Sequence, residues 1–169
     1  LLTEHCLVRP LKLEALDDAL ANQIDLSTAN AETREKIARS ERYQRALLDN
    51  FPYLVWLKDT ESRFLTVNRH MAQSVGEPST AAMLGKTDAD YYPPEFAKHY
   101  RADDSAVMAS GEKKYVIEEI ITNGARVWHE TYKAPIIDAN GAILGTVGFA
   151  RNISARKRSE EAVVMRNAA

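Results

Sequence analysis

The side chains of this 169-residue chain that could do chemistry are few and scattered. Four histidines stand at positions 5, 70, 99 and 129, so no His-x-x-x-His pair is available to hold a metal ion. The single cysteine, Cys6, has no second thiol with which to form a disulfide or a Cys-x-x-Cys motif. No glycine-rich phosphate loop and no Gly-x-Ser-x-Gly sequence occurs. We therefore expect that this chain is not an enzyme.

The stretch PPEFAKHYRADDSAV, residues 93–107, holds the remaining candidates. Its spacing predicts a helix in which His99 neighbours Phe96 and faces inward. Asp103 and Asp104 are adjacent on that helix and so about a hundred degrees apart, which prevents them from facing one substrate together. We expect these two carboxylates to be solvated or capping charges.

Composition places the chain among ordinary globular proteins, with 45% hydrophobic and 27% charged residues. A net charge of −2 gives no general attraction to nucleic acid or anionic lipid, and no run of eighteen apolar residues predicts a membrane segment. One cysteine fits a reducing compartment. Because the chain starts at Leu1 and shows no signal-peptide pattern, we expect a piece of a larger cytoplasmic protein.

The N-terminal part of the chain is predicted to be helical. Apolar residues recur every three or four positions over 13–24, which predicts a helix, and the polar segment 25–30 predicts a break or a softer stretch. Residues 31–50 carry apolar positions about a heptad apart among charges, which favours a helix that pairs with a second copy. The alternative is a helix that lies on its own domain.

From residue 53 the pattern changes to short strands rich in β-branched and aromatic residues. A hairpin is predicted over 53–68, with Ser62 in a turn position that favours glycine. Short helices and one longer helix, 94–110, follow. Strands are then predicted at 113–121, 125–135 and 142–153, the last two joined at Asn140-Gly141. Strands and helices that are segregated in this way predict an α+β fold with a five-stranded antiparallel sheet.

Several motifs in this succession resemble the PAS (sensory box) family: WLKDTESRFLTVN at 56–68, GKTD at 85–88, the 93–107 stretch, WHETYKAP at 128–135 and DANGAILGTVGFARNIS at 138–154. The resemblance implies strand order 2-1-5-4-3, helices on one face of the sheet, and a ligand cleft between the two. It also implies a sensor or interaction module that serves an output domain such as a histidine kinase, a diguanylate cyclase or a phosphodiesterase.

Nine residues are expected to line that cleft, among them one face of the strand 125–135: Trp56, Phe96, His99, Tyr100, Val107, Trp128, Glu130, Tyr132 and Phe149. The alternative is that these aromatics only fill the core. Gly145 and Gly148 indicate either close approach of another group or strong strand twist, with twist favoured.

The signal is expected to pass through Asn152, Ile153, Ser154 and Arg156 into a helix over 155–169, the start of a coiled coil. Members of the family commonly have aspartate at position 152, where it pairs with a basic residue of that helix. Asparagine there leaves at best a neutral hydrogen bond, which softens the coupling.

Two alternatives to a small-molecule sensor remain open. One is a PAS dimerisation module with a closed core and no ligand. The other is a haem sensor, because haem-binding members carry their axial histidine on the helix that corresponds to 94–110, about where His99 stands. Those members have a tyrosine three residues later, where this chain has Ala102. We expect no metal, and the cofactor, if any, is unknown.

The N-terminal 24 residues resemble, more weakly, the last strand, loop and helix of a response-regulator receiver domain, with Arg9 where that family has lysine before Pro10. The alternative is a plain linker helix. The expected organisation is therefore a linker or receiver tail (1–30), an N-terminal signalling helix (31–50), a PAS domain (51–154) and a C-terminal signalling helix (155–169). The terminal helices are expected to form a homodimer.

Overall fold

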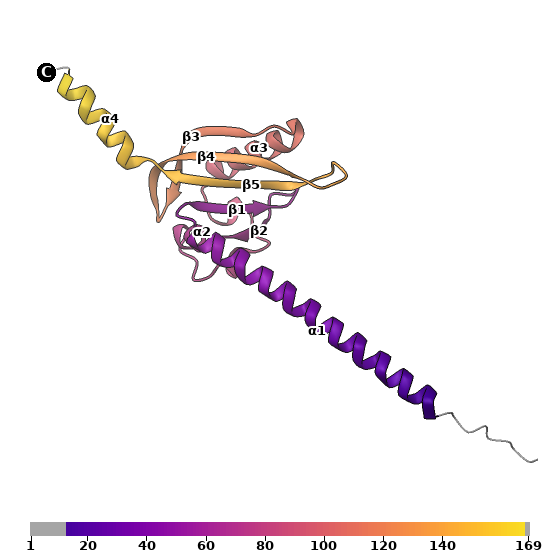
Figure 1. The fold of residues 1–169 in the computed structure, drawn as a ribbon. Helices are drawn as coiled ribbons and strands as arrows, with labels where there is room; N and C mark the ends of the chain where they lie inside the picture. The colour runs from indigo at the N-terminus through magenta and orange to yellow at the C-terminus, as the bar shows by residue number, and fades with distance from the viewer. Residues whose placement is uncertain (1–12, 168–169) are drawn as a thin grey trace, which may run out of the picture. The chain divides into compact units, whose positions relative to one another are not determined.

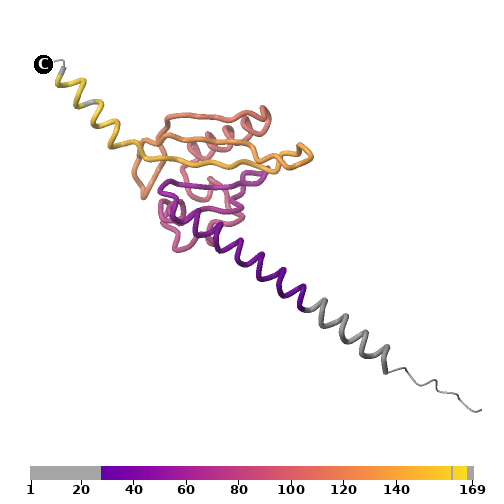
Figure 2. Tube along the Cα trace, in the orientation of Figure 1, coloured from indigo at the N-terminus to yellow at the C-terminus, as the bar shows by residue number. Residues whose placement is uncertain are grey.

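The computed structural model describes the backbone of residues 13–167 and the side chains of residues 28–160 and 162–166 (Figures 1 and 2). The chain divides into two units, Leu1–Gln44 and Arg45–Ala169. The receiver-like segment around Arg9, together with Cys6, lies outside the described residues.

A single helix, α1 (Leu13–Asn50), runs without interruption through the segment where a break was expected. That expectation is wrong, because residues 25–30 are helical. Polar residues alone do not stop a helix, and no glycine or proline occurs between positions 13 and 50. In the turn that follows, the Thr33 hydroxyl donates to the Ala29 carbonyl oxygen at 2.8 Å, as serine and threonine often do inside helices.

The second unit is built on a five-stranded antiparallel sheet, as predicted (Figure 1). Its strand order is β2-β1-β5-β4-β3. The strands are β1 (Leu54–Lys58), β2 (Phe64–Val67), β3 (Lys114–Thr122), β4 (Ala125–Ile137) and β5 (Ile143–Asn152). The predicted turns are confirmed as well: Ser62 has φ of 62°, and Gly124 and Gly141 also have positive φ.

Helical elements lie between β2 and β3 in the chain and pack on one face of the sheet. They are α2 (Arg69–Ser74), the 3₁₀ turns η1 (Thr80–Met83) and η2 (Asp88–Asp90), and α3 (Pro94–Ser110). The predicted caps are present: Asn68 Oδ1 accepts from the Met71 amide at 3.0 Å, and α3 ends at Gly111 with φ of 69°. After β5 the chain continues directly into α4 (Ser154–Asn167).

The core lies between these helices and the sheet, and it explains the two glycines of β5. A Cβ on Gly148 would come within 2.5 Å of the Trp56 indole, and one on Gly145, where φ is 145°, within 1.9 Å of the Lys58 carbonyl oxygen. Close approach of β1 therefore requires both glycines. Close approach, the alternative that was not favoured, is therefore present at both glycines.

Among the described residues, no helix is both long enough and apolar enough to cross a bilayer.

Candidate functional site

A small cavity lies in the core between the sheet and the helical layer. Its volume of about 20 Å³ holds little more than one water molecule. The lining combines apolar and aromatic side chains with ionised ones: Leu54, Trp56, Lys58, Phe64, Met71, Asp88, Tyr92, Tyr100, Glu118, Ile120 and Lys133. A few polar groups among apolar walls are typical of a small-molecule site.

Four charged side chains meet beside this cavity, two lysines from the sheet and two aspartates from the helical layer; all but Asp104 line it. Lys58 Nζ lies 2.5 Å from Asp88 Oδ2 and 3.0 Å from Asp104 Oδ2, and Lys133 Nζ lies 2.8 Å from Asp104 Oδ1. All four are buried. We call Lys58, Asp88, Asp104 and Lys133 the buried charge cluster; it balances two positive charges with two negative ones.

The two carboxylates of the buried charge cluster differ in their electrostatics. Burial raises the pKa of Asp88, and the neighbouring Lys58 only partly opposes that effect. Burial alone would also raise the pKa of Asp104, but Lys58 and Lys133 together hold it below its ordinary value. Asp104 is thus the firmly ionised centre of the cluster.

The cavity also offers uncharged hydrogen-bonding groups. Burial raises the pKa of the Tyr92 and Tyr100 phenols, so both stay protonated at neutral pH. The buried Trp56 Nε1 has no hydrogen-bond partner among the described residues. These groups, with the lysines and aspartates, could orient a small polar molecule; nothing in them forms a nucleophile–base pair for catalysis.

The nine pocket residues predicted from the sequence divide into four groups. Trp56 and Tyr100 line the cavity. Phe96, His99 and Trp128 instead border a separate open groove at the surface. Val107 is buried on α3 but does not line the cavity.

Glu130, Tyr132 and Phe149 were expected in the cleft, and that expectation is wrong. Side chains alternate along β4, and its residues His129, Thr131 and Lys133 are the ones buried beneath the helices. The neighbouring positions therefore lie on the opposite face of the sheet, where Tyr132 stacks on Phe149 with ring centroids 5.3 Å apart.

The expectation that Asp103 and Asp104 are solvated is also wrong. Both are buried on α3, and each reaches a lysine: Asp104 contacts the buried charge cluster, and Asp103 Oδ1 lies 2.5 Å from Lys114 Nζ. Charged residues are rarely buried unless they are paired, and the sequence does not show which residues pair in the fold. The cluster was missed for this reason. Strand alternation was the available signal. Lys58 falls two residues after Trp56 and therefore shares its face of β1.

The geometry does not fit haem. The His99 side chain is 54% exposed and lies on the surface groove, outside the cavity. A cavity of about 20 Å³ cannot hold a porphyrin.

Comparison with known proteins agrees with the fold. Residues 48–158, well over half of the chain, match the family model described as PAS fold. The chain belongs to the PAS family. Among solved structures, the PAS domain of BvgS from Bordetella pertussis superimposes with a TM-score of 0.59 at 20% identity, over 78% of this chain and 99% of that one.

Two curated relatives of this PAS chain are named as regulators. It is 27% identical to the methanogenesis regulatory histidine kinase FilI of Methanothrix harundinacea over 148 residues, which is 87% of this chain and 16% of that protein. It is 30% identical to the aerobic respiration control sensor protein ArcB of Escherichia coli K12 over 122 residues, 72% of this chain and 16% of that protein. The chain therefore spans only about a sixth of either relative.

A solved structure titled VqmA bound to DPO is 25% identical to this PAS chain. It superimposes with a TM-score of 0.59 and covers 65% of this chain and 56% of that one.

Within the part of the chain that the structure describes, four contacts tie the start of α4 to β4 and to the end of β5. The Ile153 amide donates to the Trp128 carbonyl at 2.9 Å, the Ser154 amide donates to Asn152 Oδ1 at 2.9 Å, and Lys157 Nζ lies 4.0 Å from the centre of the Trp128 ring. The fourth is an ion pair of 3.7 Å between Arg156 Nη1 and Glu130 Oε1.

Arg156 therefore has a carboxylate partner although position 152 is asparagine. Glu130 supplies it from β4, where it also pairs with Arg151. Glu130 thus belongs to the connection with α4 and not to the cavity.

Proposed function

We propose that this chain is the sensory module of a larger cytoplasmic signalling protein. It detects a small polar molecule or a partner at the buried cavity and relays the event through α4 to an output domain, such as a histidine kinase, a diguanylate cyclase or a phosphodiesterase. The chain itself does no catalysis. Support comes from the regulators FilI and ArcB, of which it matches a part, and from VqmA, whose solved structure is titled as bound to DPO.

One observation carries the proposal: strand β4 contributes to both the cavity and the connection with α4. Lys133, on the inner face, joins the buried charge cluster, while Glu130, three residues earlier on the outer face, holds Arg156. Trp128 lies two residues before Glu130 on the same strand, and its carbonyl oxygen accepts a hydrogen bond from the Ile153 amide. A ligand that forms a hydrogen bond with the Lys133 ammonium group shifts β4, and this shift reaches the first turn of α4. The ligand changes the equilibrium between two conformations of β4 and α4 only if it binds one conformation more tightly than the other.

The output geometry is a homodimer through the terminal helices. On α1, Ile37, Tyr43 and Leu47 have exposed fractions of 54%, 64% and 69%, and on α4, Val163, Val164 and Met165 have 52%, 67% and 76%. Apolar side chains exposed in this way on charged helices favour pairing with a second helix. The near-neutral net charge and the single cysteine support a cytoplasmic protein that does not bind nucleic acid.

The test is native mass spectrometry of the purified chain, followed by NMR titration with small polar molecules that include DPO. We expect one molecule either to be retained or to bind, and to shift the Trp56 indole N–H together with the amides of residues 152–157. Ligand-induced shifts that stop at the cavity contradict the relay.

A second function is favoured by one observation, the tightness of the cavity at about 20 Å³. In that case the module is a closed dimerisation domain. A chain that retains nothing, binds no member of the panel and still dimerises would establish this function in place of the sensor.

A further inference from the structure

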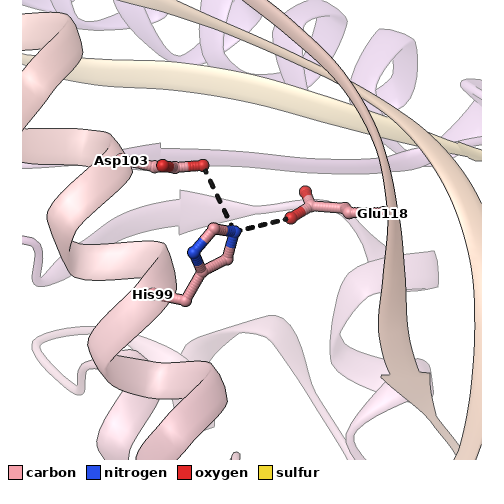
Figure 3. Close-up of side chains that lie close together, drawn as sticks. All are labelled: His99, Asp103 and Glu118. Carbon is pink, nitrogen blue, oxygen red and sulfur yellow. Dashed lines mark ion pairs between the residues drawn. The ribbon is translucent and has the colours of Figure 1, made fainter.

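Three potential metal ligands meet beside the cavity, where α3 passes the edge strand β3; of these, Glu118 also lines the cavity. His99 and Asp103 are one turn apart on α3, and Glu118 reaches them from β3 (Figure 3). His99 Nε2 lies 3.5 Å from Glu118 Oε2 and 3.8 Å from Asp103 Oδ2, and the three ligand atoms all lie within 4.8 Å of one another. Figure 3 shows the imidazole nitrogen turned toward both carboxylates.

The two carboxylates are incompletely satisfied. The side chains of Asp103 and Glu118 are only 8% and 9% exposed. Asp103 Oδ2 and Glu118 Oε2 are buried and have no hydrogen-bond partner in the part of the chain that the structure describes. Lys114 occupies only the other oxygen of Asp103. Buried carboxylate oxygens are rarely left in this way, so a positively charged group that bridges both is the expected completion.

The spacing fits a shared metal ion better than direct hydrogen bonds. A charge-assisted hydrogen bond would bring His99 Nε2 to about 2.7–2.9 Å from an oxygen. Ligand atoms about 2.1 Å from a tetrahedral ion are instead about 3.4 Å apart. The distances of 3.5 and 3.8 Å are close to the second value.

From this geometry we propose that His99, Asp103 and Glu118 form a binding site for a divalent first-row transition-metal ion such as Zn²⁺. One imidazole and two carboxylates suit such ions, whereas Mg²⁺ and Ca²⁺ prefer oxygen ligands alone. The two carboxylates outweigh the single positive charge of Lys114, so the site attracts a cation.

Three protein ligands leave a fourth coordination position, and two of them, His99 and Glu118, also line the open groove beside Phe96 and Trp128. That position is free for water or a second ligand. The bound ion would tie α3 to β3. Glu118 also lines the cavity, so the site adjoins it, but the zinc measurement needs no cavity ligand and tests this site separately from the proposed sensor function.

The competing occupant is a proton. A protonated His99 could pair with both carboxylates and leave no room for a metal ion. Zinc binding separates the two, because the ion must displace that proton and use the imidazole as a ligand.

The experiment measures Zn²⁺ affinity by competition with a chromophoric chelator after treatment with EDTA. A background with His5→Ala and Cys6→Ser removes an imidazole and a thiol that could bind zinc elsewhere. We expect one Zn²⁺ per chain, and His99→Ala or Glu118→Gln to weaken binding by about tenfold or more. His70→Ala, which removes another exposed histidine of the same unit, is the matched control and leaves the affinity unchanged.

Circular dichroism confirms that each variant folds, which is expected for His99→Ala because that side chain is half exposed. Substitution with Co²⁺ gives a second readout, a visible d–d absorption that His99→Ala alters. Equal Zn²⁺ affinity in the background chain and in its His99→Ala form overturns the proposal, and so does a failure to bind Zn²⁺ at neutral pH.

Discussion

Replacing Asp104 with asparagine should cost far more stability than the same change at Asp88, although both carboxylates contact the Lys58 ammonium. Among the described residues, Asp104 is the only carboxylate that contacts Lys133, whose other acceptor is the Tyr100 carbonyl oxygen at 3.2 Å. Without Asp104 a buried ammonium loses its counter-charge. Loss of one partner from a buried ion pair typically costs about 3–5 kcal/mol.

Asp88 is the matched control because its burial is similar and its pKa is raised rather than lowered. The folded protein already disfavours the ionised form of Asp88. Replacing it with neutral asparagine therefore removes less electrostatic stabilisation than the same change at Asp104. We expect Asp88→Asn to cost about 1–2 kcal/mol, the value of a hydrogen bond to a charged group.

A third variant separates lost charge balance from lost packing. Asp104→Leu combined with Lys133→Met removes the pair together and leaves Lys58 with Asp88. Apolar replacement of a whole buried pair is often neutral or stabilising, so this double variant should be more stable than Asp104→Asn alone.

The assay is urea denaturation at fixed protein concentration, followed by tryptophan fluorescence, because Trp56 is 6% exposed in the folded core. Equal losses for Asp88→Asn and Asp104→Asn would refute the reasoning. A double variant less stable than Asp104→Asn would refute it as well.

Three further outcomes are expected. Gly148→Ala should cost about 1–3 kcal/mol in the same assay, because the new methyl group meets the Trp56 indole, and Trp56→Phe should recover part of the loss; no loss in Gly148→Ala would contradict the close approach. Glu130→Gln should speed amide hydrogen exchange in the first turn of α4. Glu160→Gln, which removes only an exposed partner of Arg156, should not. Equal effects of the two changes would show that Glu130 does not hold α4 in place. The stability of the wild type relative to Asp88→Asn should rise as pH falls from neutral toward the ordinary value of 3.8, because a raised pKa means that the folded state favours the protonated carboxyl; a difference that shrinks on acidification would have the wrong sign.

The fold was largely predictable because its signals are local. The Asn140-Gly141 turn, the Asn68 cap and the end of α3 at Gly111 each follow from the chemistry of one or two residues, and each is confirmed. The strand order came with the resemblance to the PAS family and is also confirmed. The break expected at residues 25–30 failed because a polar segment without glycine or proline remains compatible with a helix.

The candidate site was less predictable because it depends on packing. Alternation along β4 separates Glu130 and Tyr132 from His129 and Lys133, but the pattern alone does not say which set faces the helices. The partners of the buried charge cluster are distant in sequence: Lys58 and Asp104 are 46 positions apart, and no spacing rule joins them. The approach of Glu118 to His99 is of the same kind, since it depends on how α3 lies against β3.

We propose that the cavity and α4 are coupled through β4. Hydrogen exchange measured by mass spectrometry in the wild type and in Asp88→Asn tests it most directly, with Val67→Ala as a control that destabilises the core at the β2 edge of the sheet. We expect Asp88→Asn to change exchange in residues 128–133 and in the first turn of α4, beyond any change that Val67→Ala causes there. A change confined to η2 and α3, with α4 matching the control, would contradict the claim.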